Sequence, residues 1–179
     1  MPADAPLSTR TEEKKVRIDE FCQKLQATMS TQSNLDDQMA TCAKALSSTF
    51  RVQPDEVACF RFNPDLEGFS FLWPLEMKEA GTIPFSANRS LLVRTAEERK
   101  AFLDNSFAST PHLFVFEGFN KRNNSPIQRI MSVPILRGEE LLGALQLCRR
   151  GGTSDGLPMF SEAELAALGE IVKVVATFL

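Results

Sequence analysis

The sequence predicts an α+β fold in which a largely antiparallel sheet carries the N- and C-terminal helices on one face. Apolar residues recur at helical spacing over residues 18–29 and 35–50, and again over residues 165–179. Between these segments, short apolar runs are separated by turn signals at spacings typical of hairpins. Because hairpin-linked strands pair antiparallel, helices at the two ends of the chain can cover one face of the sheet.

Composition indicates a single globular domain. The chain has 179 residues, of which 43% are hydrophobic and 24% charged. The first ten residues are rich in Pro, Ala, Asp and Ser and are predicted to be disordered. Residues 11–179 are predicted to form one domain, which begins with a helical extension over residues 11 to about 31.

Charge and hydropathy exclude several classes of protein. A net charge of -3 with a pI near 5.3 argues against a general nucleic-acid-binding protein. No apolar run approaches the roughly 18 residues of a membrane span, so no membrane insertion is expected. The first residues lack the apolar segment of a secretory signal, which favours the cytoplasm.

Helix-end signals support the N-terminal helices. The first apolar stripe ends at STQSN, which breaks the helical pattern, and Asn34 is then a candidate N-cap for the second helix. The stripes contain residues that repeat at intervals of three and four: Ile18, Phe21, Cys22, Leu25 and Met29, then Leu35, Met39, Cys42, Ala43, Leu46 and Phe50. Two linked amphipathic helices predict either an αα-hairpin or two helices that both pack on one face of a sheet.

The middle of the chain is predicted to alternate strands and short helices. Residues 57–62 alternate as a strand, and FSFLWPL is a second strand that Pro74 interrupts. Thr95 and Glu98 form a T-x-x-E capping box, which predicts a helix over residues 96–104 after a helical turn at residues 90–94. His112–Glu117 is predicted to be a strand, followed by a polar loop, GFNKRNNSP.

Two apolar runs after this loop predict a hairpin, IMSVPIL and LLGALQLC. Pro134 has no N–H to donate, so it is expected at a sheet edge or a bulge. Gly138 stands where the connecting loop needs a positive φ, and Gly143 leaves room for close packing. Ser161 and Glu164 then cap a C-terminal helix whose apolar stripe extends to Leu179.

Known catalytic and metal-binding patterns are absent from the sequence. The four cysteines, Cys22, Cys42, Cys59 and Cys148, form no CxxC pair, so neither a zinc site nor a redox dithiol is expected. Three of them lie within apolar patterns and are interpreted as small buried residues, and a reducing compartment is expected. His112 is the only histidine, which makes a Ser-His-Asp hydrolase improbable. The phosphate-binding, zinc-protease and GxSxG motifs do not occur.

The segment from Arg129 to the C-terminus resembles the end of a GAF domain, a small-molecule-sensing and dimerisation module. The matching features are Ser132 and Pro134 followed by Ile135, the strand LGALQL, a glycine-containing loop, and Phe160-Ser161 before an acidic helix start. The resemblance extends in order over residues 32–179, and residues 83–105 resemble the short helices around the family's pocket. It implies a central antiparallel sheet of about six strands, terminal helices on one face, and a pocket on the other near residues 86–105 and 112–117.

Several family subtypes differ from this sequence. Cyclic-nucleotide-binding members carry an N-K…F…D-E signature, where this chain has Arg149-Arg150, Phe160 and Glu164-Leu165. Bilin-binding and methionine-sulfoxide-reducing relatives need cysteines near the pocket, and no cysteine falls between residues 60 and 147. Haem ligation would depend on His112 alone.

Candidate ligand-binding residues have structural alternatives that the sequence leaves open. The candidates share a place near the implied pocket: Trp73, Arg89, Arg94, His112, Phe114, Phe116, Phe119 and Ser132. The arginines could hold a carboxylate or phosphate, or lie in solvent. The phenylalanines could stack on a planar ligand or pack in the core. His112 could titrate in a pocket or form a hydrogen bond within a loop. Ser132 could supply a hydroxyl to the pocket, or its small side chain could fit the bulge at Pro134.

The leading functional interpretation is a non-catalytic sensor and regulatory domain in signal transduction, which binds an unidentified small molecule and signals to a partner. The apolar stripe of the C-terminal helix has no stop signal. Because each exposed Leu, Ile or Phe would lose about 1.5–3 kcal/mol of burial free energy, we expect a homodimer that buries this stripe through the terminal helices. The alternatives are a ligand-free dimerisation scaffold, with the pocket filled by phenylalanine, and a thiol-dependent reductase of the same fold. A PAS or profilin-like sheet is the rival fold.

Overall fold

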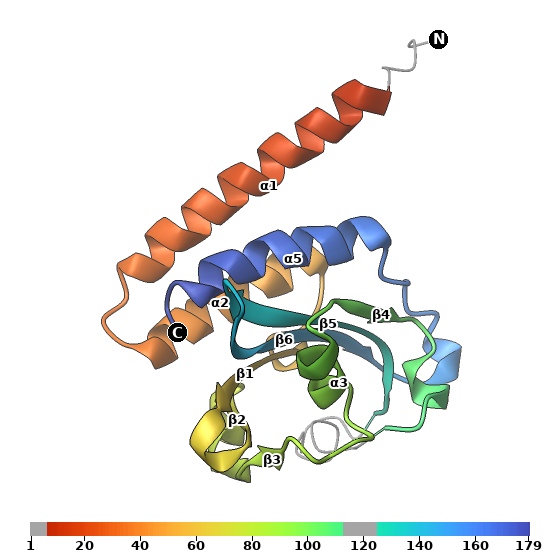
Figure 1. Cartoon of the computed structure of the whole chain (residues 1–179). Helices are drawn as coiled ribbons and strands as arrows, with labels where there is room; N and C mark the ends of the chain where they lie inside the picture. The colour runs from red at the N-terminus through yellow and green to blue at the C-terminus, as the bar shows by residue number, and fades with distance from the viewer. Residues whose placement is uncertain (1–6, 113–124) are drawn as a thin grey trace.

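A computed structural model of the chain describes residues 7–112 and 125–179. Its centre is an antiparallel sheet in the order β3-β2-β1-β6-β5-β4, which confirms the predicted α+β class and strand pairing (Figure 1). The strands are β1 (Val57–Asn63), β2 (Gly68–Trp73), β3 (Ile83–Pro84), β4 (Phe102–Asp104), β5 (Ile127–Arg137) and β6 (Glu140–Arg150). The expected strand at residues 112–117 and the loop after it lie largely outside the described residues.

Helices cover the sheet in layers (Figure 1). On one face, α2 (Leu35–Phe50) packs on β1 and β2, and α5 (Glu162–Ala176) packs on β5. The long helix α1 (Leu7–Ser30) crosses above them and contacts both. On the other face, α3 (Leu91–Glu98) packs on β5 and β6. The terminal helices therefore share one face of the sheet, as predicted.

The local helix signals act as expected in α1 and α2. Asn34 caps α2, because its side-chain oxygen accepts a hydrogen bond of 2.9 Å from the backbone N–H of Asp37. Leu25 and Met29 are buried against α2 and α5, while Ile18 and Phe21 are half-buried. Helix α1 begins at Leu7, before the expected start near residue 11, because the residues after Pro6 include no helix breaker. The first six residues lie outside the described part.

Strand alternation divides the core into two clusters. Val57 and Cys59 face the α2–α5 layer, whereas Ala58 and Phe60 face α3. This is the alternation that the sequence predicts for residues 57–62. Since side chains of successive strand residues point to opposite faces, both faces of β1 are buried and each needs its own cover.

The long hairpin of β5 and β6 explains its proline and glycines. Pro134 lies two residues beyond Ser132, the last residue of β5 that pairs with β4, so its missing N–H interrupts no described strand pairing. Gly138 turns the hairpin with φ 60°. Gly143 pairs with Arg61, and a Cβ placed on it would stand 1.9 Å from the carbonyl oxygen of Phe60. Only glycine allows β1 and β6 to approach so closely.

The predicted helix over residues 96–104 is wrong. Helix α3 begins after Ser90, whose hydroxyl caps it, and ends at Glu98, with Arg99 in the left-handed conformation. Thr95 does not cap a helix, because its hydroxyl points inward and donates to the carbonyl of Leu91 one turn back. Residues 102–104 instead form β4, which pairs with β5 at Ile130–Ser132.

Helix α5 buries its apolar stripe within the chain, and this corrects the stated reason for a dimer. Ser161 and Glu164 form the predicted capping box. Leu168, Ile171 and Val175 are fully buried between α5, the sheet and its neighbours, whereas the first residue of the stripe, Leu165, and its last two residues are half-buried. The sheet and α1 thus cover most of the surface that was expected to need a second copy. Among the described helices, none is both long and apolar enough to span a bilayer.

Candidate functional site

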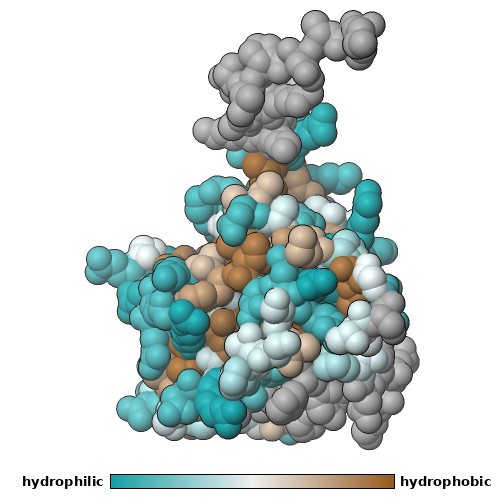
Figure 2. All heavy atoms as spheres, turned by 90° about the vertical axis from the view of Figure 1, so that its right-hand side faces the viewer, coloured by the Kyte–Doolittle hydropathy of each residue, from teal (hydrophilic) through white to brown (hydrophobic). Residues whose placement is uncertain are grey.

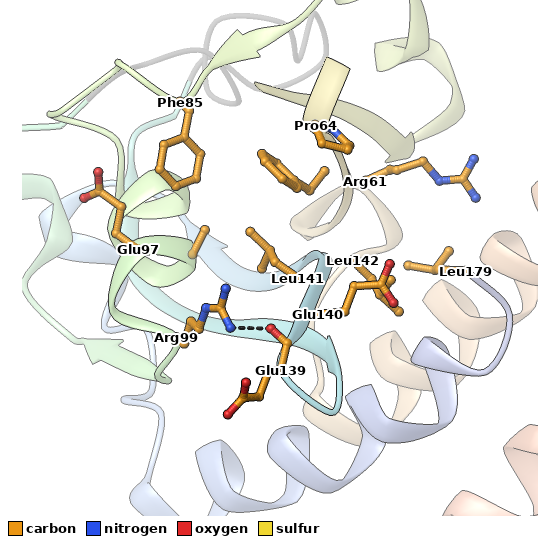
Figure 3. A pocket seen from close by; sticks show the side chains of 12 residues that line it. Arg61, Pro64, Phe85, Glu97, Arg99, Glu139, Glu140, Leu141, Leu142 and Leu179 are labelled. Atoms are coloured by element: carbon orange, nitrogen blue, oxygen red, sulfur yellow. Dashed lines mark hydrogen bonds between the residues drawn. The ribbon is translucent and has the colours of Figure 1, made fainter. Parts of the chain in front are cut away.

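A cavity of about 680 Å³ opens at the end of the sheet where β1 and β6 separate (Figure 3). Its volume is in the range of small-molecule sites. The apolar lining comes from five parts of the chain that are distant in sequence: Phe62, Phe85, Ala96, Leu141, Leu142 and Leu179. Most of these side chains are only half-buried although they belong to apolar clusters, which is expected where a core opens to solvent.

Strand register creates this opening. Pairing of β1 with β6 ends at Arg61 and Gly143. Beyond that point, Phe62 pairs only with β2, and Leu141 pairs only with β5. The two strands therefore diverge after the tight contact at Gly143. The C-terminal end of α3 and the chain end after α5 complete the walls.

An aromatic cluster forms one side of the cavity. The ring centroids of Phe62 and Phe85 lie 5.6 Å apart in an edge arrangement, and Phe69 lies 5.2 Å and 6.0 Å from these two. Such distances are typical of stabilising aromatic pairs. The rings hold each other in place, so the cavity keeps a preformed apolar wall.

Charged side chains stand at the rim, and Arg99 faces the cavity. Figure 3 shows the guanidinium of Arg99 directed across the opening toward the hairpin, where it donates a hydrogen bond to the backbone carbonyl of Glu139. The carboxylates of Glu97 and Glu139 point away from the centre in the same view, and the guanidinium of Arg61 extends to the far side. Among these charged groups, the guanidinium of Arg99 is the one directed across the opening.

Ser132 lies beneath α3 in a buried polar network, away from this lining. Its hydroxyl is 2.7 Å from that of Thr95 and accepts a hydrogen bond of 3.0 Å from the side-chain amide of Gln146. All three side chains are at least nine-tenths buried. The network fixes α3 on β5 and β6, so it sets the position of the helix whose end lines the cavity.

The other sequence-predicted candidates are dispersed. Arg89 is exposed, and Arg94 is exposed and paired with Glu98 at 2.7 Å. Trp73 packs with the helical layer on the opposite side of the sheet and donates to the carbonyl of Pro54 at 2.8 Å. Phe114, Phe116 and Phe119 lie outside the described residues, so their role stays a prediction.

His112 is a buried histidine that packs in its own loop. Its ring stacks on Phe107 with centroids 3.9 Å apart. Its Nδ1 lies 2.5 Å from the carbonyl oxygen of Thr110, which can only accept, so Nδ1 carries the proton. It is not among the side chains that line the cavity.

The positions of the cyclic-nucleotide signature form a structural cluster. Arg149 is buried, donates to the carbonyls of Phe50 and Pro158, and lies 3.6 Å from the carboxylate of Glu164. Its guanidinium carbon stands 3.9 Å from the ring centroid of Phe160. Burial is the main cause that lowers the pKa of Arg149 from its ordinary value. This cluster joins β6, α2 and the start of α5.

The thiols are poorly placed for chemistry. Cys42, Cys59 and Cys148 are buried, and burial raises the pKa of Cys42 and of Cys148 to about 12 and that of Cys59 further. Cys22 is half-buried, and its pKa is raised as well, chiefly by burial. A reactive cysteine needs a lowered pKa and exposure. Within the described ranges no group of His, Cys, Asp and Glu could hold a metal ion.

Comparison with solved structures identifies the fold. The GAF domain of the Acinetobacter phosphoenolpyruvate-protein phosphotransferase superposes with a TM-score of 0.69 at 10% identity, covering 90% of this chain and 92% of that one. The GAF domain of the Coxiella burnetii phosphoenolpyruvate-protein phosphotransferase superposes with a TM-score of 0.67 at 13% identity, covering 89% of this chain and 90% of that one. The chain has the GAF-domain fold. No family model and no curated protein sequence matches it.

The GAF fold also occurs in an enzyme. The free methionine-R-sulfoxide reductase of Neisseria meningitidis, solved with its substrate, superposes with a TM-score of 0.64 at 16% identity, covering 89% of this chain and 86% of that one. The fold is therefore compatible with sensing and with catalysis, and the side chains of this chain must decide between them.

Sequence reasoning missed the residues that line the cavity. Arg99, Phe62, Phe85 and Leu141 read as ordinary surface or core residues, because nothing local marks the separation of β1 from β6. One signal was available: Gly143 marked a close strand contact, and the strands diverge directly after it.

Proposed function

We propose that this chain is a non-catalytic sensor domain of the GAF type, which binds a small molecule in the cavity between β1, α3 and the β5–β6 hairpin. The observation that carries the proposal is the cavity itself, about 680 Å³, with an apolar wall and charged side chains at its rim, where the guanidinium of Arg99 is directed across the opening. Concave sites of this volume that combine apolar side chains with oriented polar groups are typical of small-molecule binding.

The cavity is lined by elements that could transmit a signal when a ligand binds. Leu179 follows α5, Ala96 belongs to α3, and Leu141 belongs to the hairpin. A ligand that contacts all three favours the conformation in which they close on it. Because α5 packs against α1, a shift at Leu179 changes the packing of the terminal helices, which a partner protein can read.

A thermal-shift screen with a cavity-filling variant tests the proposal. A ligand present at about 100 times its Kd adds about 2.7 kcal/mol of stability. For a chain of this size that corresponds to a rise in melting temperature of about 5–10 °C. Leu141→Trp fills the cavity and should abolish the rise, whereas Leu75→Trp, at an exposed position outside the lining, should retain it.

We further propose that the chain forms a homodimer through its terminal helices. Ile18, Phe21 and Cys22 remain half-buried on α1, and Figure 2 shows apolar atoms at the surface of this helix below its grey segment. Elsewhere on that face, apolar side chains emerge in small groups among polar ones. Light scattering at micromolar concentration should give twice the chain mass and the monomer mass for Phe21→Lys; a monomeric wild type would contradict the proposal.

The two alternatives make different predictions. A ligand-free scaffold would show the dimer but no stabilising ligand in the screen. A thiol-dependent reductase is disfavoured by the raised pKa values of the four thiols, and retention of any detected reductase activity in a Cys59→Ala/Cys148→Ala variant would dismiss it. Four free cysteines support a reducing compartment such as the cytoplasm.

A further inference from the structure

The backbone at Arg99 adopts a conformation that disfavours its side chain. Its φ of 50° lies in the left-handed region at the C-terminal end of α3, where glycine is the usual residue. Arg51 and Glu67 share this conformation, but neither belongs to the cavity lining. Strained residues cluster at ligand sites, because the surrounding structure holds them there for function.

The guanidinium of Arg99 has N–H donors that remain available to a ligand. A guanidinium carries five N–H groups, and the contact with the Glu139 carbonyl occupies one nitrogen. Among the described residues, no carboxylate lies within 4 Å of it in an ion pair, whereas Arg94, Arg137 and Arg149 each have one. The bond to the hairpin backbone orients the guanidinium, which pairs with no carboxylate in the described part of the chain.

The acidic residues of the rim do not neutralise this charge. Glu140 lies 3.9 Å from Arg137 on the hairpin. The carboxylates of Glu97 and Glu139 are directed outward (Figure 3). The guanidinium of Arg99 is therefore available to a ligand seated against Phe62 and Phe85.

We propose that the cavity binds an amphipathic organic carboxylate, with its apolar body against Phe62, Phe85 and Leu141 and its carboxylate on Arg99. A single planar guanidinium fork matches one carboxylate in a bidentate geometry. The apolar wall excludes small inorganic anions as sufficient ligands, because they would leave it uncovered. This inference rests on the proposed sensor function and specifies its ligand class.

Isothermal titration of the full chain with three matched probes tests the ligand class. The probes are 2-naphthoate, the neutral 2-naphthamide and the cationic 2-naphthylmethylamine, which share one apolar body. The carboxylate should bind at least about tenfold more tightly than either analogue, and its affinity should fall as salt concentration rises. Decanoate against decanol repeats the comparison on an aliphatic body.

Two variants assign the interaction to Arg99. Arg99→Gly places the preferred residue in the left-handed conformation, so the protein should fold with an unchanged or higher melting temperature and yet lose about tenfold or more in carboxylate affinity. Arg99→Gln should do the same for affinity. Arg94→Gln, on the same helix and outside the lining, should bind as the wild type does.

The outcomes separate the two proposals. If the amide or amine binds as tightly as the carboxylate, or if the Arg99 variants keep the affinity, the carboxylate assignment is overturned while the sensor function stands. If none of the probes binds and the wider thermal-shift screen finds no ligand, both are overturned.

Discussion

Thr95 and Ser132 join the two sides of the α3–sheet interface through a hydrogen bond of 2.7 Å between their buried hydroxyls. The two residues are 37 positions apart in the chain, and Gln146 donates to the same Ser132 oxygen from β6. The helix at the cavity is thus fixed to the two central strands by polar contacts in an otherwise apolar layer.

Removing the Thr95 hydroxyl should destabilise the fold. Thr95→Val keeps the shape but leaves the buried Ser132 hydroxyl without this partner, which should lower the free energy of unfolding by about 1–3 kcal/mol. Urea unfolding of Thr95→Val, Ser132→Ala and the double variant measures the coupling between them. Thr28→Val, on the exposed surface of α1, is the control; equal effects at Thr28 and Thr95 would refute a special role for the network.

Two glycine-to-alanine changes should have opposite effects. In Gly143→Ala the new Cβ would stand 1.9 Å from the Phe60 carbonyl oxygen, which forces β1 and β6 apart and should cost more than about 2 kcal/mol. Gly169→Ala meets open space in α5 and should stabilise the protein by about 0.5–1 kcal/mol. Thermal unfolding of both variants is the measurement, and a harmless Gly143→Ala would show that the strand contact is looser than described.

Replacement of Arg149 should be severely destabilising. Its charged guanidinium donates to the carbonyls of Phe50 and Pro158, and each such hydrogen bond contributes about 1.5–3 kcal/mol. Arg149→Lys should fail nearly as badly as Arg149→Met, because an ammonium group cannot span both carbonyls in the fork geometry. Arg94→Gln, which removes an exposed ion pair, should cost less than about 1 kcal/mol. Chemical denaturation distinguishes them, and a stable Arg149→Met would overturn the structural role of the cluster.

The buried thiols should resist alkylation in the folded protein. Cys42 and Cys148 have pKa values of about 12, so both thiolate formation and access are suppressed near neutral pH. Mass spectrometry after iodoacetamide treatment should find Cys22 modified first and the other three only after urea is added. Rapid labelling of Cys59 or Cys148 in the native state would revive the reductase alternative.

The same pKa values predict loss of stability in alkali. The folded chain holds its thiol protons up to about pH 12, whereas an unfolded cysteine releases its proton near its ordinary pKa of 9.0. The unfolded state therefore binds fewer protons between these values, and the free energy of unfolding falls as pH rises above about 9. Urea titrations across this range should show the decline, and Cys148→Ala should reduce its slope.

Local signals in the sequence were sufficient for most of the fold. Asn34, the Ser161–Glu164 box and the alternation in β1 act through neighbours within one turn or strand, so they could be predicted. Thr95 was wrongly predicted to cap a helix. Its hydroxyl instead forms a hydrogen bond with Ser132 on β5, and this long-range contact has no local sequence signal. The strand β4 is only three residues long and exists because β5 offers an edge to it.

The candidate site could not be predicted from sequence for a related reason. The cavity arises where β1 and β6 stop pairing, and its lining joins residues as far apart as Phe62 and Leu179. The left-handed backbone of Arg99 at the end of α3 likewise has no local signal, because no glycine marks that position. Ser132, a candidate from the sequence, lies in the buried network with Thr95 and Gln146 beneath α3.

Hydrogen–deuterium exchange with and without a ligand identified in the thermal-shift screen tests the central claim most directly, because it locates the bound molecule on the chain. We expect slower exchange at the end of α3, in the hairpin near Glu139–Leu142 and at the residues after α5, with little change around Arg149. Protection confined to the Arg149 cluster or to the outer surface of α1, with the cavity walls unchanged, would contradict the account.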